Sequence, residues 1–75
     1  MRGYSIRMAE AINAADSGHI GVKLGRACLV RDIPVSVVAE ALGVTRQTVY
    51  HWFIGLSEPR GRTVDAIQTY INSLD

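Results

Sequence analysis

The sequence has very little cysteine or proline and no long apolar run. With one cysteine, Cys28, among 75 residues, no disulfide can form within the chain. No apolar stretch approaches the roughly 20 residues of a membrane-spanning helix, and the first residues lack the apolar core of a signal peptide. We therefore expect a cytoplasmic protein, with little disorder because low-complexity segments are missing.

The sequence also lacks the side chains that catalysis and metal binding require. Its two histidines, His19 and His51, cannot form a metal site with one cysteine and no patterned carboxylates. There is no nucleophile–base constellation and no phosphate-cradling glycine loop, and so short a chain has little room to enclose a pocket. We expect neither an enzyme nor a metal or other cofactor.

A large excess of one charge is missing as well, since the formal net charge is only +1. The charges are nevertheless unevenly placed along the chain. Residues 20–62 hold six basic and three acidic side chains, a surplus of +3, whereas residues 63–75 hold two acidic side chains and no basic one. A basic surplus in the middle of the chain suits a small electrostatic footprint on phosphates.

The sequence does contain a central segment, residues 35–55, that predicts two short helices joined by a tight turn. The first helix is indicated by apolar residues at the spacing of a buried helix face: Val35, Val38, Ala39 and Leu42. Gly43 then ends this helix, because a residue without Cβ readily takes the left-handed conformation of a helix terminus. Val44 is apolar and fits the corner between the two helices.

The second predicted helix follows Thr45, whose hydroxyl suits an N-cap. Val49, Trp52 and Phe53 lie three and four residues apart, which predicts a buried face and favours core packing of the two aromatic rings over base stacking. The opposite face is expected to be exposed and carries the following side chains: Arg46, Gln47, Tyr50 and His51. Gly55 closes the helix.

A polar-faced helix packed crosswise on a small apolar one forms a helix-turn-helix, whose second helix enters the DNA major groove. The segment resembles the lambda-repressor-like (Cro-type) helix-turn-helix proteins in the register of these residues: Val38-Ala39, Gly43-Val44-Thr45, Val49, Trp52 and Gly55. The resemblance implies an all-α fold, a compact bundle of about five short helices in one domain. It also implies a homodimer on double-stranded DNA, with half-sites about 34–36 Å apart.

Apolar periodicity predicts further helices on both sides of the motif. They are expected at residues 5–16, 19–31 and 63–74. Ser5 and Thr63 are the expected N-caps of the first and last of these helices, and Gly25 is expected to allow a close helix approach. The N-terminal helix is an addition to what the resemblance requires, and the outward face of the last helix is a candidate dimer surface.

The resemblance places base-reading side chains at the start and on the outward face of the second motif helix. The guanidinium of Arg46 matches O6 and N7 of guanine, and Gln47 can pair with N6 and N7 of adenine. The expected base contacts are Arg46, Gln47, Tyr50, His51 and Thr48. The expected phosphate contacts are Thr45, Arg60, Arg62, Lys23 and Arg26. A plain solvated surface position is the alternative interpretation for five of these residues: Arg46, Gln47, His51, Arg60 and Arg62.

The leading hypothesis is sequence-specific DNA binding that regulates transcription by operator occupancy, as in the small Cro-type repressors of phages and bacteria. The alternative hypothesis keeps the fold but uses it as a protein-interaction module that binds a host regulator or RNA polymerase. The small net charge, the additional N-terminal helix and Pro34–Val35 favour the alternative. Family members usually carry a polar, phosphate-contacting side chain at this helix start, where only backbone N–H groups remain available here.

Overall fold

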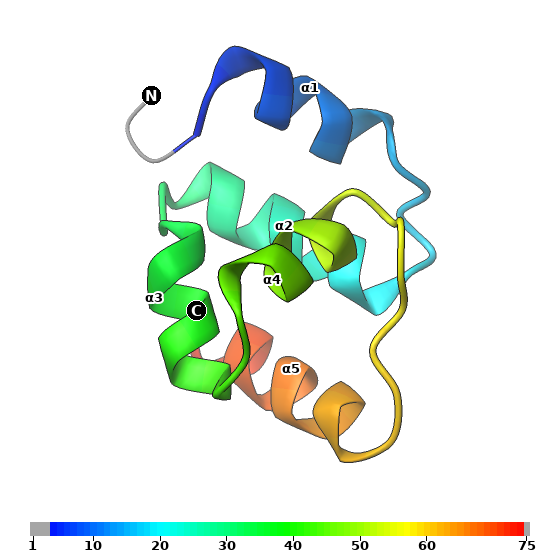
Figure 1. Ribbon diagram of the computed structural model, residues 1–75, viewed down its shortest axis with the longest axis vertical. Coiled ribbons are helices and arrows are strands. Elements are labelled where there is room, and N and C mark those ends of the chain that lie inside the picture. Colours follow the sequence, from blue (N-terminus) through cyan, green and yellow to red (C-terminus); the bar gives the residue numbers. More distant parts are fainter. Residues whose placement is uncertain (1–3, 75) are drawn as a thin grey trace.

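Short helices with brief connections make up the chain in a computed structural model, which describes residues 4–74 (Figure 1). The helices are α1 (Ile6–Ala14), α2 (Ile20–Val30), α3 (Val35–Leu42), α4 (Arg46–Phe53) and α5 (Arg62–Ser73). No strand occurs within the described range. The predicted all-α bundle of about five short helices is therefore confirmed.

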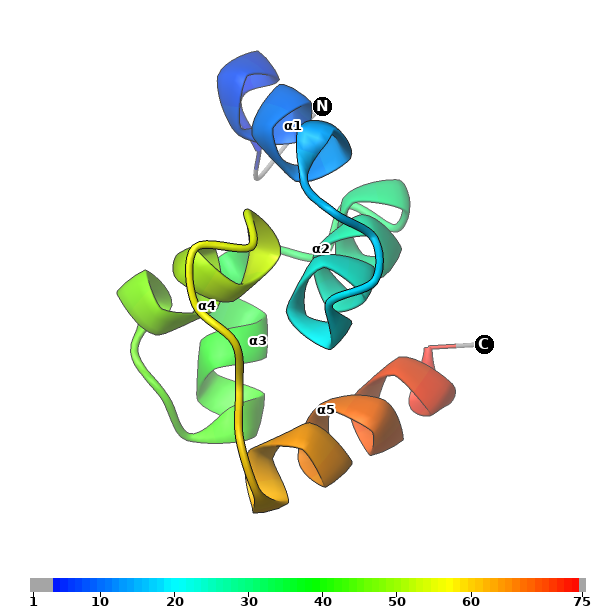
Figure 2. The same cartoon turned by 90° about the vertical axis from the view of Figure 1, so that its right-hand side faces the viewer.

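Helix α2 is the central element of the bundle. It packs against α1, α4 and α5, while α3 packs against α4 and α5. Helix α1 lies above α2 and α5 lies below it in both views (Figures 1 and 2). Helix α4 crosses in front of α2 in Figure 1 and lies to its left in Figure 2, so α4 forms one face of the bundle.

The turn between α3 and α4 has the predicted chemistry. Gly43 takes the left-handed conformation, with φ 69° and ψ 32°, and its N–H donates to the carbonyl oxygens of Ala39 and Glu40. Thr45 is the N-cap of α4, and its Oγ1 accepts a hydrogen bond from the Thr48 N–H at 3.2 Å. Val44 is partly buried against the core between the two helices.

Of the two predicted N-caps of the outer helices, the one at the start of α1 is confirmed and the one at the start of α5 is wrong. The Ser5 Oγ accepts a hydrogen bond from the Met8 N–H at 3.0 Å, as expected. The prediction of Thr63 as the cap of α5 is wrong, because α5 begins at Arg62 and its N-cap is Gly61. Gly61 has φ 60° and ψ −132°, a conformation that residues with a Cβ avoid, so the glycine lets the helix begin before Thr63.

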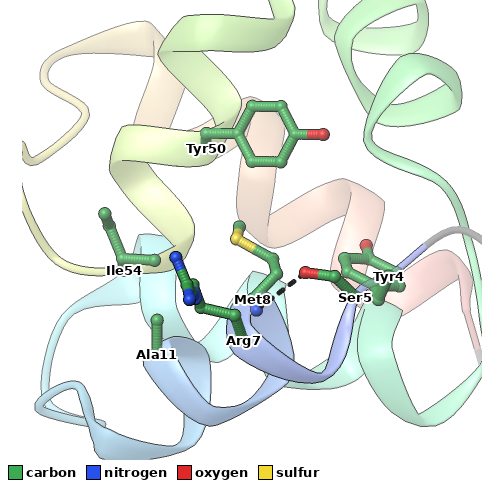
Figure 3. Close-up of a pocket in the computed structure, with 7 residues that line it drawn as sticks. All are labelled: Tyr4, Ser5, Arg7, Met8, Ala11, Tyr50 and Ile54. Carbon is green, nitrogen blue, oxygen red and sulfur yellow. Dashed lines mark hydrogen bonds between the residues drawn. The ribbon is translucent and has the colours of Figure 1, made fainter.

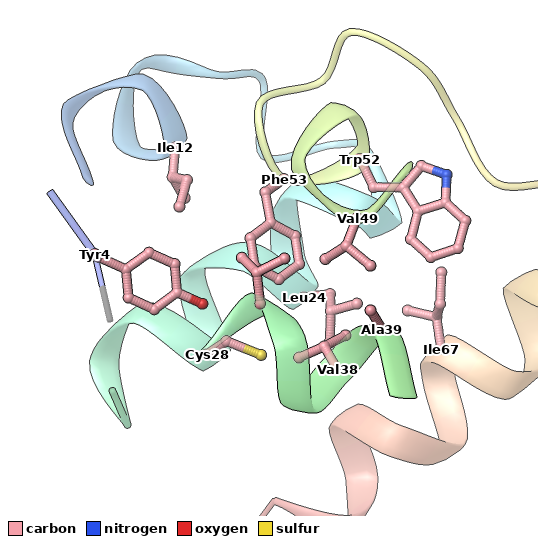
Figure 4. Packing of buried hydrophobic residues seen from close by; sticks show 11 residues of the cluster. Tyr4, Ile12, Leu24, Cys28, Val38, Ala39, Val49, Trp52, Phe53 and Ile67 are labelled. Carbon is pink, nitrogen blue, oxygen red and sulfur yellow. The ribbon is translucent and has the colours of Figure 1, made fainter. Parts of the chain in front are cut away.

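The core forms where α2, α3, α4 and α5 meet. Its largest fully buried side chains come from every helix: Phe53, Ile12, Leu24, Ile67, Val22, Val38, Val49 and Cys28. Figure 4 shows that side chains from residues far apart in the sequence point toward one centre, with Phe53 between α1 and α2 and Trp52 beside Ile67. Cys28 is buried in this core as a free thiol.

Two glycines on one face of α2 allow α4 to approach closely. A Cβ atom on Gly21 would lie 2.7 Å from the backbone oxygen of Trp52, and one on Gly25 would lie 2.9 Å from Cγ of Phe53. Such distances are shorter than van der Waals contact, so neither position has room for a methyl group. The expectation that Gly25 permits close helix approach is confirmed, and Gly21 has the same role one turn earlier.

Tyr4 anchors the N-terminal segment, a role that the sequence analysis missed. Its hydroxyl donates to the Ile33 carbonyl oxygen at 2.6 Å, and its ring stacks on Phe53 with the centroids 6.5 Å apart. Burial raises the pKa of the Tyr4 phenol well above its ordinary value. The start of α1 is thereby held beside the connection between α2 and α3.

We predict that Gly21→Ala lowers the free energy of unfolding by about 1–3 kcal/mol, because the methyl group collides with the backbone of α4. The collision should cost more than the roughly 1 kcal/mol that alanine gains over glycine within a helix, so the substitution is destabilising overall. Urea denaturation followed by circular dichroism measures the change. Gly18→Ala is the matched control, since a Cβ there would meet only the exposed carboxylate of Asp16. Equal stability of the two variants would contradict the close approach.

We predict that Cys28 resists alkylation in the folded protein. Burial raises the pKa of its thiol from an ordinary value of 9.0 to about 11, so the reactive thiolate is scarce and shielded at pH 8. Labelling with iodoacetamide should be slow in buffer and fast in denaturant. Because the folded pKa is the higher one, the thiol contributes stability below pH 9 that is lost as the pH rises toward 11. Equally fast labelling with and without denaturant would show that the thiol is accessible.

Candidate nucleic-acid interface

Helix α4 buries one face and exposes the other. Val49, Trp52 and Phe53 are 0%, 5% and 0% exposed. With 3.6 residues per turn, the direction opposite these three side chains is that of Gln47 and His51. Gln47 is exposed and His51 is partly exposed. The helix therefore has the predicted orientation, with its apolar side in the core and a polar side directed away from the bundle.

Arg46, Tyr50 and Thr48 flank the centre of the exposed face. Arg46 is exposed, and Tyr50, one turn later on the same flank, is 40% exposed. Thr48 lies on the other flank and is less available, because its hydroxyl is 2.9 Å from the Thr45 hydroxyl in the N-cap. By helical position, Gln47 and His51 lie at the centre of the exposed face, whereas Arg46 and Thr48 lie at its two edges.

The N-terminal end of α4 is a favourable place for a negative charge. Its first turn contains no acidic residue, so nothing from the helix itself neutralises the positive end of the helix dipole. The first turn of α4 also projects furthest from the bundle, at the left in Figure 2. Thr45, predicted to contact a phosphate, is exposed at this end. Backbone N–H groups in the first turn of α4 can therefore approach an anion, whereas the Thr45 hydroxyl is already engaged with Thr48.

The loop after α4 carries Arg60, and Arg62 begins α5; both side chains are exposed. Two contacts hold the loop against the rest of the protein. The Leu56 N–H donates to the His51 carbonyl oxygen at 2.9 Å, and the Glu58 carboxylate contacts Nδ1 of His19 at the start of α2. The two arginines consequently extend from an anchored segment that directly follows α4.

Lys23 and Arg26 do not lie beside the exposed face of α4. Nη2 of Arg26 donates to the carbonyl oxygens of Asn13 and Ala15, each at 3.0 Å, and so caps the C-terminal end of α1. Lys23 is exposed, but it lies on the side of α2 opposite Gly21, and Gly21 faces α4. Helix packing therefore places these two residues apart from the other predicted phosphate contacts, which lie at the start of α4 or after it.

A pocket of about 400 Å³ separates α1 from α4 (Figure 3). Its lining residues are Tyr4, Ser5, Arg7, Met8, Ala11, Tyr50 and Ile54. No residue of α1 was predicted from the sequence to lie beside the exposed face of α4. Periodicity identifies the face of a helix that is buried, but no local signal in residues 5–16 indicates which neighbour α1 packs against.

The arrangement of α3 and α4 defines a class of protein. Two short helices joined by a glycine in the left-handed conformation and a capping threonine, with the second helix exposing polar side chains, form a helix-turn-helix. Residues 31–75, which are 45 of the 75 residues, match the family model described as Helix-turn-helix (HTH_3). The chain belongs to this family, the lambda repressor and Cro-like helix-turn-helix DNA-binding proteins. No curated protein and no solved structure matches it.

Two other kinds of feature are absent from residues 4–74. None of the described helices has the length and hydropathy of a membrane span. No group of three or more His, Cys, Asp or Glu side chains in this range is placed to hold a metal ion. The exposed side of α4 and the segments beside it are the part of the described surface that fits a known class of ligand.

We predict that Thr45→Ala lowers the free energy of unfolding by about 1 kcal/mol, the usual cost of losing an N-cap hydroxyl. The Thr48 N–H would lose its acceptor at the start of α4. Thermal denaturation followed by circular dichroism measures the loss. Thr69→Ala is the matched control, because Thr69 is exposed within α5. A loss of the same size in both variants would show that the Thr45 cap contributes nothing specific.

Proposed function

We propose that this protein binds double-stranded DNA sequence-specifically and regulates transcription by occupying an operator. The orientation of α4 is the observation that carries this proposal. Trp52 and Phe53 anchor the helix in the core, while Arg46 and Gln47 extend from its projecting end. An α-helix about 10–12 Å in diameter fits the major groove, which is about 12 Å wide.

Each side chain of the exposed face has a distinct chemical use in the groove. Arg46 can donate two hydrogen bonds to O6 and N7 of guanine, and Gln47 can pair with N6 and N7 of adenine. His51 lies one turn beyond Gln47 in the same direction and reaches a base further along the site. Tyr50, on the flank, is suited to a thymine methyl group or a phosphate, and Thr48 reaches a base only where the groove comes closest.

Backbone contacts would position the helix in the groove. Thr45 and the N–H groups at the start of α4 are suited to one phosphate. Arg60 and Arg62 follow α4 directly and are suited to phosphates on the side of the loop. With few cations in the interface, the affinity of one subunit should be modest and should fall steeply with salt.

Two copies of the chain would be needed to read a two-fold symmetric operator. The largest dimension of the bundle is 31 Å. Half-sites of helix-turn-helix proteins are separated by about 34–36 Å, so one subunit reads one half-site. We propose a homodimer that presents two α4 helices to successive major grooves on one face of the DNA, with the outward side of α5 as its candidate interface.

We predict that the wild-type protein enriches a palindromic consensus from a random pool of DNA duplexes. Arg46→Ala and Gln47→Ala should each weaken binding to that consensus by about 10-fold to 100-fold per half-site, since one bidentate base contact discriminates by about 1–3 kcal/mol. Each variant should also relax the preference at one base position. Fluorescence anisotropy with labelled duplexes measures the affinity, and Lys23→Ala, remote from α4, is the control.

Two outcomes would contradict the assignment. Unchanged affinity and consensus in the Arg46→Ala, Gln47→Ala double variant would show that α4 does not read bases. Failure of the wild-type protein to enrich any sequence would favour the alternative, in which the fold binds a host regulator or RNA polymerase. The net charge of only +1 is the observation that favours this second function.

A further inference from the structure

Helix α1 places one cation, Arg7, beside the proposed recognition helix. Arg7 lines the pocket between the helices together with Tyr50 and Ile54 of α4 (Figure 3). Tyr50 belongs to the flank of α4 that faces α1, next to the exposed polar face. The Arg7 side chain is thus a near neighbour of the proposed DNA surface, although 43 residues separate it from Tyr50 in the sequence.

The Arg7 guanidinium is available for a partner outside the protein. Its side chain is exposed, and it forms no hydrogen bond or ion pair with any residue in the range 4–74. Glu10, one turn later on α1, does not line the pocket. Met8 and Ala11 do line it, so α1 presents a face of one cation and small or apolar side chains to α4.

The neighbouring helix start has no side-chain cap and no basic residue in its first turn. Pro34 is the N-cap of α3 and makes no side-chain hydrogen bond there, and Val35 is only 3% exposed. Tyr4 binds the backbone of Ile33 in the same connection and fixes the start of α1 next to it. Helix α3 thus supplies no cation at its start, whereas α1 carries the exposed Arg7.

The two flanks of α4 are then both bordered by cations. Helix α1 lies above α4 in Figure 2, whereas the loop after α4 runs down to the start of α5 below it. Arg7 occupies the upper flank, and Arg60 and Arg62 belong to the lower segment. A helix lying in a groove about 12 Å wide has a phosphate backbone along each flank.

We propose that Arg7 binds a backbone phosphate of the DNA strand that borders the major groove on the α1 side of α4. The inference rests on the proposed function, since it needs α4 in the groove. It assigns the additional N-terminal helix a part in DNA binding, where it supplies the phosphate contact for which Pro34 and Val35 have no side chain. A phosphate contact strengthens binding without reading sequence.

The test compares Arg7→Ala with Lys23→Ala, because each variant removes one exposed cation and only Arg7 lies beside α4. Binding to the selected duplex is measured by fluorescence anisotropy over a range of salt concentrations. For Arg7→Ala, the slope of log K against log salt should become shallower by about 0.9 per bound subunit, as expected for one lost phosphate contact. Lys23→Ala should leave the slope unchanged.

Two further measurements separate a phosphate contact from other effects. Arg7→Ala should select the same consensus as the wild-type protein, because a phosphate contact does not distinguish bases, and Arg7→Lys should restore most of the salt slope. Circular dichroism should show that the Arg7 variants remain folded, since the side chain is exposed.

The outcomes distinguish failure of this inference from failure of the proposed function. If the wild-type protein selects a consensus and Arg7→Ala has the wild-type slope, or if Lys23→Ala changes the slope equally, the Arg7 contact is overturned while DNA reading stands. An altered consensus in Arg7→Ala would also overturn the phosphate contact, because it would indicate base reading. If the wild-type protein selects no DNA, the proposed function fails and the Arg7 contact fails with it.

Discussion

The close approach of α2 and α4 is the constraint on which the rest of the structure depends. Gly21 and Gly25 place no side chain of α2 between the two helices, so Trp52 and Phe53 of α4 lie directly on the backbone of α2. Two aromatic side chains on an eight-residue helix can then be buried almost completely. Because that side of α4 is fixed in the core, the opposite side is directed away from the bundle, and its polar side chains become available to a partner.

The additional helix α1 strengthens the same arrangement from the other side. Tyr4 stacks on Phe53 and donates its hydroxyl to Ile33, which links the start of the chain to α4 and to the connection before α3. Arg26 caps the opposite end of α1. A small domain buries a smaller share of its surface than a large one, so such links between elements contribute a substantial part of its stability. Helix α1 thereby becomes an integral part of the bundle next to the proposed DNA surface.

The positions of the charged residues explain more about this protein than its net charge does. Arg26 is a structural cap, and Lys23 lies on the side of α2 away from α4, so neither belongs to the exposed face of α4. Arg46 lies at the start of α4, which carries no acidic residue in its first turn, and exposed basic residues border the flanks of the helix. A net charge of +1 is therefore compatible with a local positive surface suited to a phosphate backbone.

The sequence by itself determined the features that depend on neighbouring residues. The left-handed Gly43, the Thr45 cap and the buried side of α4 follow from local conformational preference and helical periodicity, and these features identify the helix-turn-helix. Only the tertiary structure decided which exposed cations share a surface. Arg26 binds α1, Lys23 is directed away, and Arg7 lies next to Tyr50, because the packing of α1 and α2 brings together residues between which no local rule acts.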